Sequence, residues 1–248
     1  MDGWQRTVVW RSSPEVATWR LRSPDGVVRY LKVARGGRGR TLGEERRRME
    51  WAAPYVPVPT VLTGGSNAAA EWLLTAALPG ADATVHPLRR DPARLVPMLA
   101  CGLRRFHDAL PVDSCPFDYR LEGALRQARR RVADGLVAEG DLHADHGGLP
   151  PAAALAQLEA LRPAGENVVV CHGDYCLPNV LVTEQGVAGY VDLGRLGLAD
   201  RWWDLAVAAW SVQWNLGADW EDVFFAAYGV PRDARRVAFY RLLYDLLT

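Results

Sequence analysis

The chain has little lysine. It contains a single lysine, Lys32, beside 28 arginines. Lys32 lies in an apolar run at residues 30–33, where a compact ammonium on a flexible stem offers something that the planar guanidinium of arginine cannot replace. This scarcity singles out Lys32 as a candidate functional residue. The alternative is an ordinary strand residue whose charged end reaches solvent.

Three further absences narrow the class of protein. The 248 residues include four cysteines with no paired C-x-x-C spacing, which favours reduced thiols over a zinc site or disulfides. No apolar run approaches the ~20 residues of a membrane span, and no signal-peptide core is visible, so we expect a cytoplasmic protein without a membrane partner. The formal net charge is zero, which gives no support to nucleic-acid binding.

A segment far along the chain combines polar residues with apolar flanks. The tripeptide H-G-D ends at Asp174, and Asn179 follows five residues later, between two β-rich runs. A further predicted strand ends in D-L-G, which begins at Asp192. Protein kinases place a catalytic Asp, an Asn five residues later and a metal-binding Asp in this order.

Phosphoryl transfer explains why these residue types are needed. A carboxylate must orient the attacking hydroxyl and take its proton, a role that suits Asp174. Mg²⁺ prefers hard oxygen ligands, which Asn179 and Asp192 offer. Lys32 then becomes the cation that grips the nucleotide phosphates, and it needs a carboxylate partner.

The best partner lies in a predicted helix over residues 42–51, whose apolar residues allow one buried stripe. Glu45 and Met49 are one turn apart and share a face, so Glu45 can point inward. We therefore choose Glu45 over Glu44. The alternative is that both glutamates are solvated partners of the neighbouring arginines.

At these residues the chain resembles the aminoglycoside phosphotransferase family, and most closely the 3′-phosphotransferases, which are antibiotic kinases. The similarity runs from about residue 20 to the C-terminus and is dense in residues 115–118, 192–206 and 239–243. The resemblance implies an α+β, two-lobed protein-kinase-like fold with ATP or GTP as co-substrate, Mg²⁺ as cofactor and a small-molecule antibiotic as acceptor. It also implies Asp174 as base, Asn179 and Asp192 as metal ligands, and Lys32 with Glu45 as the nucleotide-side ion pair.

The pattern of elements predicts two lobes. Residues 1–78 form a β-rich nucleotide lobe, with a hairpin around residues 24–26 and strands near 59–62 and 72–75. A hinge follows at about 76–80, where the resemblance implies that the backbone of Ala76 to Leu78 contacts adenine. Residues 79–248 form a mainly helical lobe.

Two smaller features complete the nucleotide and core predictions. The loop between the first two strands, residues 11–17, contains no glycine, so Ser12 and Ser13 would have to cover the phosphates. Leu95, Leu99, Leu103 and Phe106 share one helical face that ends near His107. We interpret His107 as a core histidine rather than a ligand.

The acceptor side departs from the 3′-phosphotransferase pattern. Asp141 matches a substrate-binding acid of the family, and Arg195 and Asp245 are further candidate substrate contacts. Relatives carry charged residues at positions that are here occupied by His143, Ala144, Trp210 and Ser211. Each lost carboxylate removes a charge-assisted hydrogen bond to an ammonium, worth about 1.5–3 kcal/mol.

Tryptophans gather in the same C-terminal region, where they offer surfaces for stacking or simply pack the core. They are Trp202, Trp203, Trp210, Trp214 and Trp220. Trp210 stands where a ligand-facing charged residue is expected and is the candidate acceptor contact.

These residues leave two candidate acceptors open and give less support to other classes of protein. One acceptor is an ordinary aminoglycoside, and the other is a less cationic sugar-bearing antibiotic such as a capuramycin-type nucleoside, which the pocket residues favour. A catalytically dead binding module is disfavoured because the charged site is retained. A protein kinase is disfavoured because no activation segment or A-P-E triplet follows D-L-G. The sequence predicts no particular oligomeric state and no preference for ATP over GTP.

Overall fold

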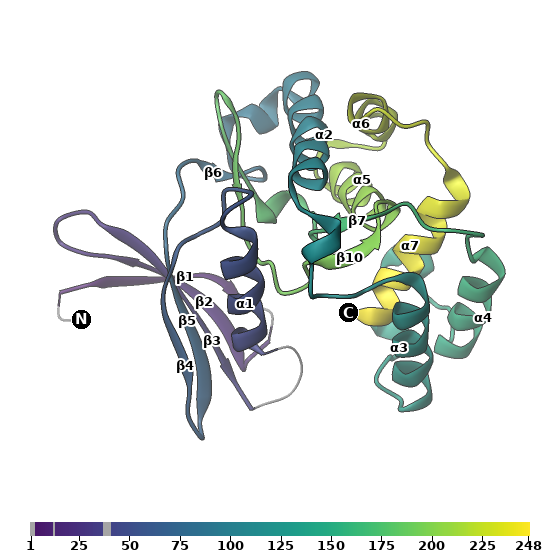
Figure 1. Ribbon diagram of the computed structural model, residues 1–248, viewed down its shortest axis with the longest axis horizontal. Helices are drawn as coiled ribbons and strands as arrows, with labels where there is room; N and C mark the ends of the chain where they lie inside the picture. Colours follow the sequence, from purple (N-terminus) through teal and green to yellow (C-terminus); the bar gives the residue numbers. More distant parts are fainter. Residues whose placement is uncertain (1–2, 12, 37–40) are drawn as a thin grey trace. The chain divides into compact units, whose positions relative to one another are not determined.

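The computed structural model describes residues 3–11, 13–36 and 41–248 (Figure 1). The chain divides into two compact units. Unit 1 comprises Met1–Ala81 and Val180–Arg195, and unit 2 comprises Asp82–Asn179 and Leu196–Thr248. None of the helices in the described residues is both long and apolar enough to cross a membrane.

Unit 1 is built on a five-stranded antiparallel sheet with the order β1-β2-β3-β5-β4. Its elements are β1 (Gln5–Arg11), β2 (Val16–Arg22), β3 (Val28–Arg35), α1 (Leu42–Ala52), β4 (Val61–Ser66) and β5 (Ala70–Ala76). The predicted hairpin joins β2 to β3, and its turn closes through Gly26, whose φ of 91° suits glycine. Helix α1 packs against β3, β4 and β5 (Figure 1).

A second small sheet completes unit 1 and changes the predicted boundary. The hairpin of β8 (Val180–Thr183) and β9 (Gly186–Tyr190) follows the short strand β6 (Ala81–Asp82) in the order β6-β8-β9. We expected residues 79–248 to form the second lobe, but residues 79–81 and the hairpin group with unit 1. The hairpin does so because Tyr190 donates its main-chain N–H to Pro57 and Gly189 lies close against Leu78.

Unit 2 is mainly helical. It contains α2 (Pro92–Ala109), α3 (Leu121–Ala133), α4 (Pro151–Leu161), α5 (Trp202–Leu216), α6 (Trp220–Tyr228) and α7 (Ala234–Leu247), with β7 (Val168–Cys171) paired to β10 (Gly197–Asp200). The predicted apolar face at residues 95–106 of α2 is buried, as expected. The β-rich first unit and helical second unit confirm the α+β class.

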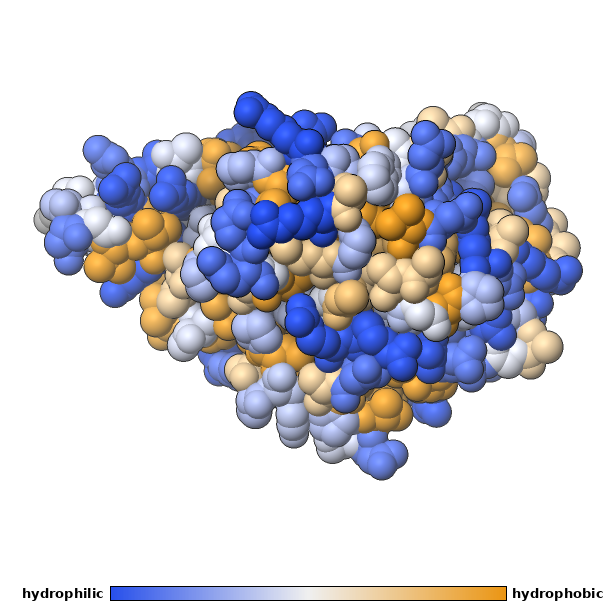
Figure 2. All heavy atoms as spheres, turned by 90° about the horizontal axis from the view of Figure 1, so that it is seen from above, coloured by the Kyte–Doolittle hydropathy of each residue, from blue (hydrophilic) through white to orange (hydrophobic). Residues whose placement is uncertain are grey.

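The surface is mixed in character. In the view of Figure 2, hydrophilic and hydrophobic residues are interspersed over the visible face. Exposed apolar side chains among the described residues include Val8, Val9 and Trp10 of β1 and Trp214 of α5. The buried apolar residues lie in the helical core of unit 2 and beneath the sheet of unit 1.

Candidate active site

Lys32 joins two carboxylates within unit 1. Its Nζ lies 2.8 Å from Glu45 Oε2 and 2.9 Å from Asp192 Oδ1. Strand β3 and helix α1 bring Lys32 and Glu45 together, because α1 packs on the sheet with Glu45 buried. Glu44 instead pairs with Arg48 over 3.4 Å along the helix. The structure therefore unites the three residues that sequence motifs had placed in separate segments.

The charges of Lys32, Glu45 and Asp192 shift the pKa values of this cluster. Burial by itself lowers the pKa of Lys32, but the negative charges of Glu45 and Asp192 outweigh it and hold the pKa above its ordinary value. Burial, together with the charge of Asp192, raises the pKa of Glu45, while Lys32 opposes that rise. A cation held between two carboxylates suits contact with phosphate groups, because it stays charged at neutral pH.

The backbone at Asp192 is unusual. Among the described residues, Asp192 is the one non-glycine with a positive φ, at 62°. A non-glycine residue in this region costs about 1–3 kcal/mol and persists where the surroundings impose it. Here the bend aims the carboxylate of Asp192 at Lys32.

In unit 2, Asp174 follows β7 in a loop that ends at Asn179. Asn179 Nδ2 donates to Asp174 Oδ2 over 3.1 Å and to its main-chain oxygen over 3.0 Å. Tyr244 of α7 donates its hydroxyl to Asp174 Oδ1 over 2.8 Å. The carboxylate is therefore held from two sides, and Asp174 is only partly buried, which leaves it accessible to a substrate.

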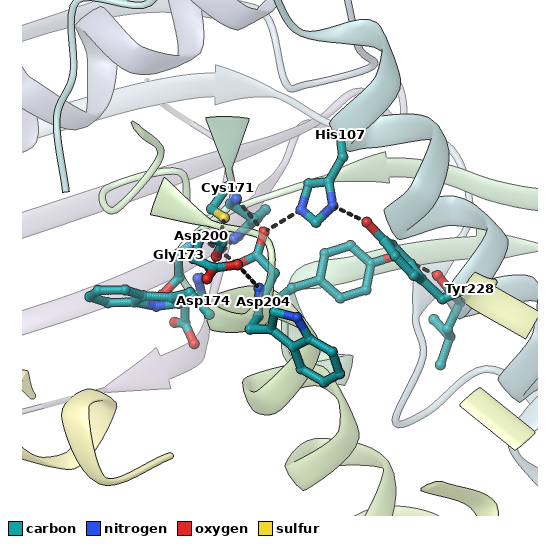
Figure 3. Close-up of polar contacts among 12 residues, drawn as sticks. His107, Cys171, Gly173, Asp174, Asp200, Asp204 and Tyr228 are labelled. Atoms are coloured by element: carbon teal, nitrogen blue, oxygen red, sulfur yellow. Dashed lines mark hydrogen bonds and ion pairs between the residues drawn. The ribbon is translucent and has the colours of Figure 1, made fainter. Parts of the chain in front are cut away.

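A buried carboxylate beneath this loop fixes its backbone (Figure 3). Asp204 of α5 is fully buried and accepts hydrogen bonds from the main-chain N–H groups of His172, at 2.6 Å, and Gly173, at 2.8 Å. The same carboxylate lies 3.0 Å from His107 Nε2, and His107 Nδ1 bonds to the hydroxyl of Tyr228 over 2.8 Å. This network holds the H-G-D backbone in one position.

The residues of this network do not resemble a metal centre. The ligand atoms of His107, Cys171 and Asp204 lie within 4.8 Å of one another. However, burial raises the pKa of the Cys171 thiol well above its usual value, so the metal-binding thiolate is disfavoured. Asp204 is already engaged by two main-chain donors. His107 is thus a core histidine, as expected.

The predicted acceptor contacts are engaged with other residues of unit 2. Trp210 is 1% exposed, and its Nε1 donates to Asp145 Oδ2 over 2.6 Å. This corrects the expectation that Trp210 faces a ligand, because its ring packs against His143 and Trp214. The side chain of Trp210 therefore belongs to the core of unit 2.

The two remaining acids on the acceptor side are also bonded within the protein. Asp245 is buried and accepts hydrogen bonds from the Nδ1 atoms of His143 and His146 and from the main-chain N–H of His143. Asp141 accepts from the main-chain N–H of Ala138 over 2.8 Å. Asp245 therefore has little capacity left for an ammonium group.

The other predicted contacts have specific positions. Ser12 lies outside the described residues. Ser13 accepts from the main-chain N–H groups of Glu15 and Val16, both at 3.2 Å, and so closes the turn between β1 and β2. The N–H of Ala76 is used by Thr60 in unit 1. Adenine would therefore have to use other backbone groups near residues 76–80.

Leu78 and Arg195 belong to unit 1. Leu78 packs against Gly189 at the hairpin of β8 and β9. Arg195 is half-buried at the end of that unit, directly after D-L-G.

Sequence reasoning missed one residue of the site. Tyr244 reaches Asp174 from α7, and no local pattern marks this contact.

A family model for the phosphotransferase enzyme family matches residues 3–240. The chain belongs to this family. It is 40% identical over 211 residues to an aminoglycoside 3′-phosphotransferase of Streptomyces fradiae, an alignment that covers 82% of this chain and 78% of the relative. The predicted family and the predicted enzyme class, a phosphotransferase with a hydroxyl group as acceptor, are confirmed.

Solved structures agree with this phosphotransferase assignment. An aminoglycoside 3′-phosphotransferase of type VIII is 35% identical, with a TM-score of 0.88 over 99% of this chain and 94% of the other. The aminoglycoside phosphotransferase APH(3'')-Id of Streptomyces rimosus, in complex with ADP and streptomycin, is 33% identical, with a TM-score of 0.80 over 99% and 93%. The two-lobed kinase-like fold is therefore confirmed.

Proposed function

We propose that this phosphotransferase is an antibiotic kinase that transfers the γ-phosphate of ATP to a sugar hydroxyl of an aminoglycoside, as a 3′-phosphotransferase does. The observation that carries the proposal is the environment of Asp174. Asp174 is only partly buried, its loop is anchored by Asp204, and the hydroxyl of Tyr244 lies 2.8 Å from its Oδ1. This is the contact that a general base makes with the group it deprotonates.

The mechanism follows from the roles that these residues can perform. Asp174 orients the acceptor hydroxyl and accepts its proton, and the hydroxyl oxygen attacks the γ-phosphorus of the nucleotide. Lys32, held between Glu45 and Asp192, neutralises charge on the nucleotide phosphates. Asp204 acts at a distance by holding the loop that carries Asp174.

The side chains of Asn179 and Asp192 each offer an oxygen of the kind that Mg²⁺ binds. An amide oxygen and a carboxylate oxygen are hard donors, and Mg²⁺ completes its shell with water and substrate phosphates. The backbone strain at Asp192 also fits a residue whose direction matters. When bound, Mg²⁺ would neutralise charge that develops on the transferred phosphoryl group.

We propose ATP as the co-substrate, because the structure of the aminoglycoside phosphotransferase APH(3'')-Id, to which this chain is similar, contains ADP. GTP is the alternative, since backbone groups near residues 76–80 do not by themselves distinguish the purines. An enzyme that consumes ATP works where ATP is abundant, so we also propose the cytoplasm as its location.

As the acceptor we propose an aminoglycoside, in place of the nucleoside antibiotic that the sequence of the pocket residues favoured. The similar proteins are aminoglycoside kinases. The nucleoside hypothesis depended on Trp210 as a stacking surface, and Trp210 is buried. The scarcity of free carboxylates remains, because Asp245 is occupied by His143 and His146. We therefore propose an aminoglycoside bound with fewer ammonium–carboxylate contacts than usual.

A coupled ADP-release assay tests the proposal. The wild-type protein is measured with Mg·ATP or Mg·GTP and with neomycin, kanamycin, streptomycin or a capuramycin-type nucleoside, beside Asp174→Asn as the inactive control. We expect turnover with at least one aminoglycoside, and mass spectrometry should place one phosphate on the sugar. Turnover of the nucleoside alone would overturn the proposed acceptor.

The salt dependence of KM tests how strongly acceptor binding depends on ammonium–carboxylate pairs. Binding through many ammonium–carboxylate pairs weakens as ionic strength rises, because exposed charges separated by more than about 8–10 Å are screened near physiological salt. We expect KM for the preferred aminoglycoside to rise only a few-fold between low and physiological salt. A much steeper rise would show that carboxylates other than Asp245 dominate acceptor binding.

A further inference from the structure

Tyr244 places a hydroxyl group on the carboxylate that we assign as the catalytic base. It lies in the last turn of α7 and donates to Asp174 Oδ1 over 2.8 Å. A general base needs its proton donor within about 2.6–3.2 Å. The tyrosine hydroxyl therefore makes the contact with Oδ1 that the hydroxyl of an acceptor has to make.

The two hydrogen bonds to Asp174 differ in origin. Asn179, which bonds Oδ2, belongs to the same loop and also bonds the main-chain oxygen of Asp174. Tyr244 is 70 positions away in the chain, and its hydroxyl donates to Oδ1 from helix α7, outside the loop. An acceptor can replace the tyrosine hydroxyl without disturbing the loop, whereas replacing Asn179 would break the loop's own bonds.

The turn of α7 that carries Tyr244 is held in place by the next residue. The buried carboxylate of Asp245 accepts from the main-chain N–H of His143 over 3.2 Å and from Nδ1 of His146 over 2.7 Å. The ring of His143 lies 6.5 Å from the ring of Tyr244. Because the helix end is fixed, the tyrosine hydroxyl leaves Asp174 by side-chain rotation, and the helix does not have to move.

We propose that Tyr244 is a specificity-determining residue that guards the base. Its hydroxyl occupies Oδ1 of Asp174, so water is not activated there, and an acceptor is phosphorylated only if its binding displaces the tyrosine. This inference rests on the proposed role of Asp174 and goes beyond it by naming how the enzyme separates its acceptor from water.

The reaction that Tyr244 suppresses is ATP hydrolysis. In it, a water molecule gives a proton to Asp174 while its oxygen forms a bond to the γ-phosphorus. The bond between that phosphorus and the β,γ-bridging oxygen breaks, and ADP leaves with the electron pair. Transfer to an acceptor forms and breaks the corresponding bonds, with the acceptor hydroxyl in place of water.

The test is Tyr244→Phe, which keeps the ring and removes the hydroxyl. Tyr55→Phe is the matched control, because Tyr55 is an exposed tyrosine of unit 1. Without any acceptor, we expect Tyr244→Phe to hydrolyse Mg·ATP about three- to tenfold faster than wild type, the change expected from the net contribution of one typical hydrogen bond, since Asp174 is only partly buried. Adding Asp174→Asn to this variant should abolish the gain.

Acceptor kinetics give a second measurement. With the preferred aminoglycoside from the panel of neomycin, kanamycin and streptomycin, Tyr244→Phe should lower KM about three- to tenfold and leave kcat within about twofold. The KM for ATP should not change. Tyr244→Leu, which also lacks the hydroxyl, should raise hydrolysis in the same direction if Tyr244→Phe folds poorly.

Several outcomes would overturn the guard role. Unchanged hydrolysis in both variants, or a fall in kcat at constant KM, would mean that Tyr244 orients Asp174 instead of competing with the acceptor. Phosphate found on Tyr244 after incubation with Mg·ATP would make the tyrosine an acceptor itself.

The proposed function can fail separately. If wild type phosphorylates no aminoglycoside yet hydrolyses ATP through Asp174, the acceptor is wrong and the hydrolysis rates still decide the role of Tyr244. No nucleotide turnover dependent on Asp174 in wild type or Tyr244→Phe would overturn both proposals.

Discussion

Lys32 Nζ lies 2.9 Å from Asp192 Oδ1, although the two residues are 160 positions apart in the chain. The two carboxylates that contact Lys32 differ in exposure, because the side chain of Glu45 is 9% exposed and that of Asp192 is 41% exposed. Glu45 is therefore the buried partner of the lysine, and Asp192 is the more exposed one. The single lysine of the chain thus links the fold of unit 1 to the D-L-G motif.

Asp174→Asn should lower turnover by about two to four orders of magnitude, the usual contribution of a general base. Nucleotide affinity should stay within a few-fold of wild type, because the substitution preserves shape. Steady-state rates beside calorimetric titration with ADP check both expectations. A variant that keeps more than about a tenth of wild-type turnover would remove Asp174 from this role.

Asn179→Ala and Asp192→Ala should each raise the Mg²⁺ concentration required for nucleotide binding and turnover. A lost oxygen ligand weakens the metal site, and high Mg²⁺ partly restores it, whereas it cannot restore a lost base. Titrations of ADP affinity against Mg²⁺ give the binding readout. Asp108→Ala, at an exposed surface pair, serves as the control, and unshifted Mg²⁺ curves in both site variants would refute the assignment.

Asp204→Ala should destabilise the fold by about 3–5 kcal/mol, because it leaves buried donors and His107 without their carboxylate. Turnover should fall by about 10²-fold even where the protein is folded, since the loop that carries Asp174 loses its anchor. Urea unfolding and assays at low temperature separate the two effects. A stable variant with wild-type turnover would show that the loop is held by other contacts.

The stability of the protein should fall at alkaline pH, in part through Tyr228. Burial raises the pKa of Tyr228 from 10.0 to about 12. Between these values the unfolded chain loses the phenolic proton while the folded protein keeps it. The contribution of Tyr228 is therefore fully present below pH 10 and is lost as pH rises toward 12.

Tyr228→Phe should remove this part of the alkaline loss. At neutral pH the variant should be less stable by about 0.5–1.5 kcal/mol, because the hydrogen bond to His107 is gone. Urea unfolding of wild type and variant across the alkaline range measures the difference. Tyr55→Phe, at an exposed site, should leave the slope unchanged, and parallel curves for wild type and Tyr228→Phe would contradict the prediction.

Trp210→Phe should cost about 1.5–3 kcal/mol of stability, since it breaks the charged hydrogen bond to Asp145. The KM for the aminoglycoside should change by less than about threefold, the effect of less than one hydrogen bond, because Trp210 is buried. Trp214→Phe, at a side chain that is half-exposed, should cost little stability. A large rise in KM with unchanged stability of Trp210→Phe would restore its ligand-facing role.

The sequence indicated much of the architecture and the candidate chemistry. The hairpin around residues 24–26, the apolar face of α2 and the division into a β-rich and a helical part could be predicted, because turn chemistry and periodicity act over a few residues. Glu45 could be chosen over Glu44 for the same reason, since position on a helix face depends on local spacing.

The acceptor side could not be predicted in this way. A tryptophan at position 210 leaves open whether the ring faces a ligand or the core, and only its burial and its hydrogen bond to Asp145 decide it. The boundary of the units was also missed, since the grouping of residues 180–195 depends on contacts with Pro57 and Leu78.

The sequence by itself therefore determined which residue types stand at which spacing in H-G-D-x-x-x-x-N and D-L-G, because these motifs are short and their geometry is set by neighbouring backbone. Only the tertiary structure decided that Lys32 lies between Glu45 and Asp192 and that Tyr244 rests on Asp174. Such contacts join residues distant in the chain, and their existence depends on how helices and strands pack, which no local pattern encodes.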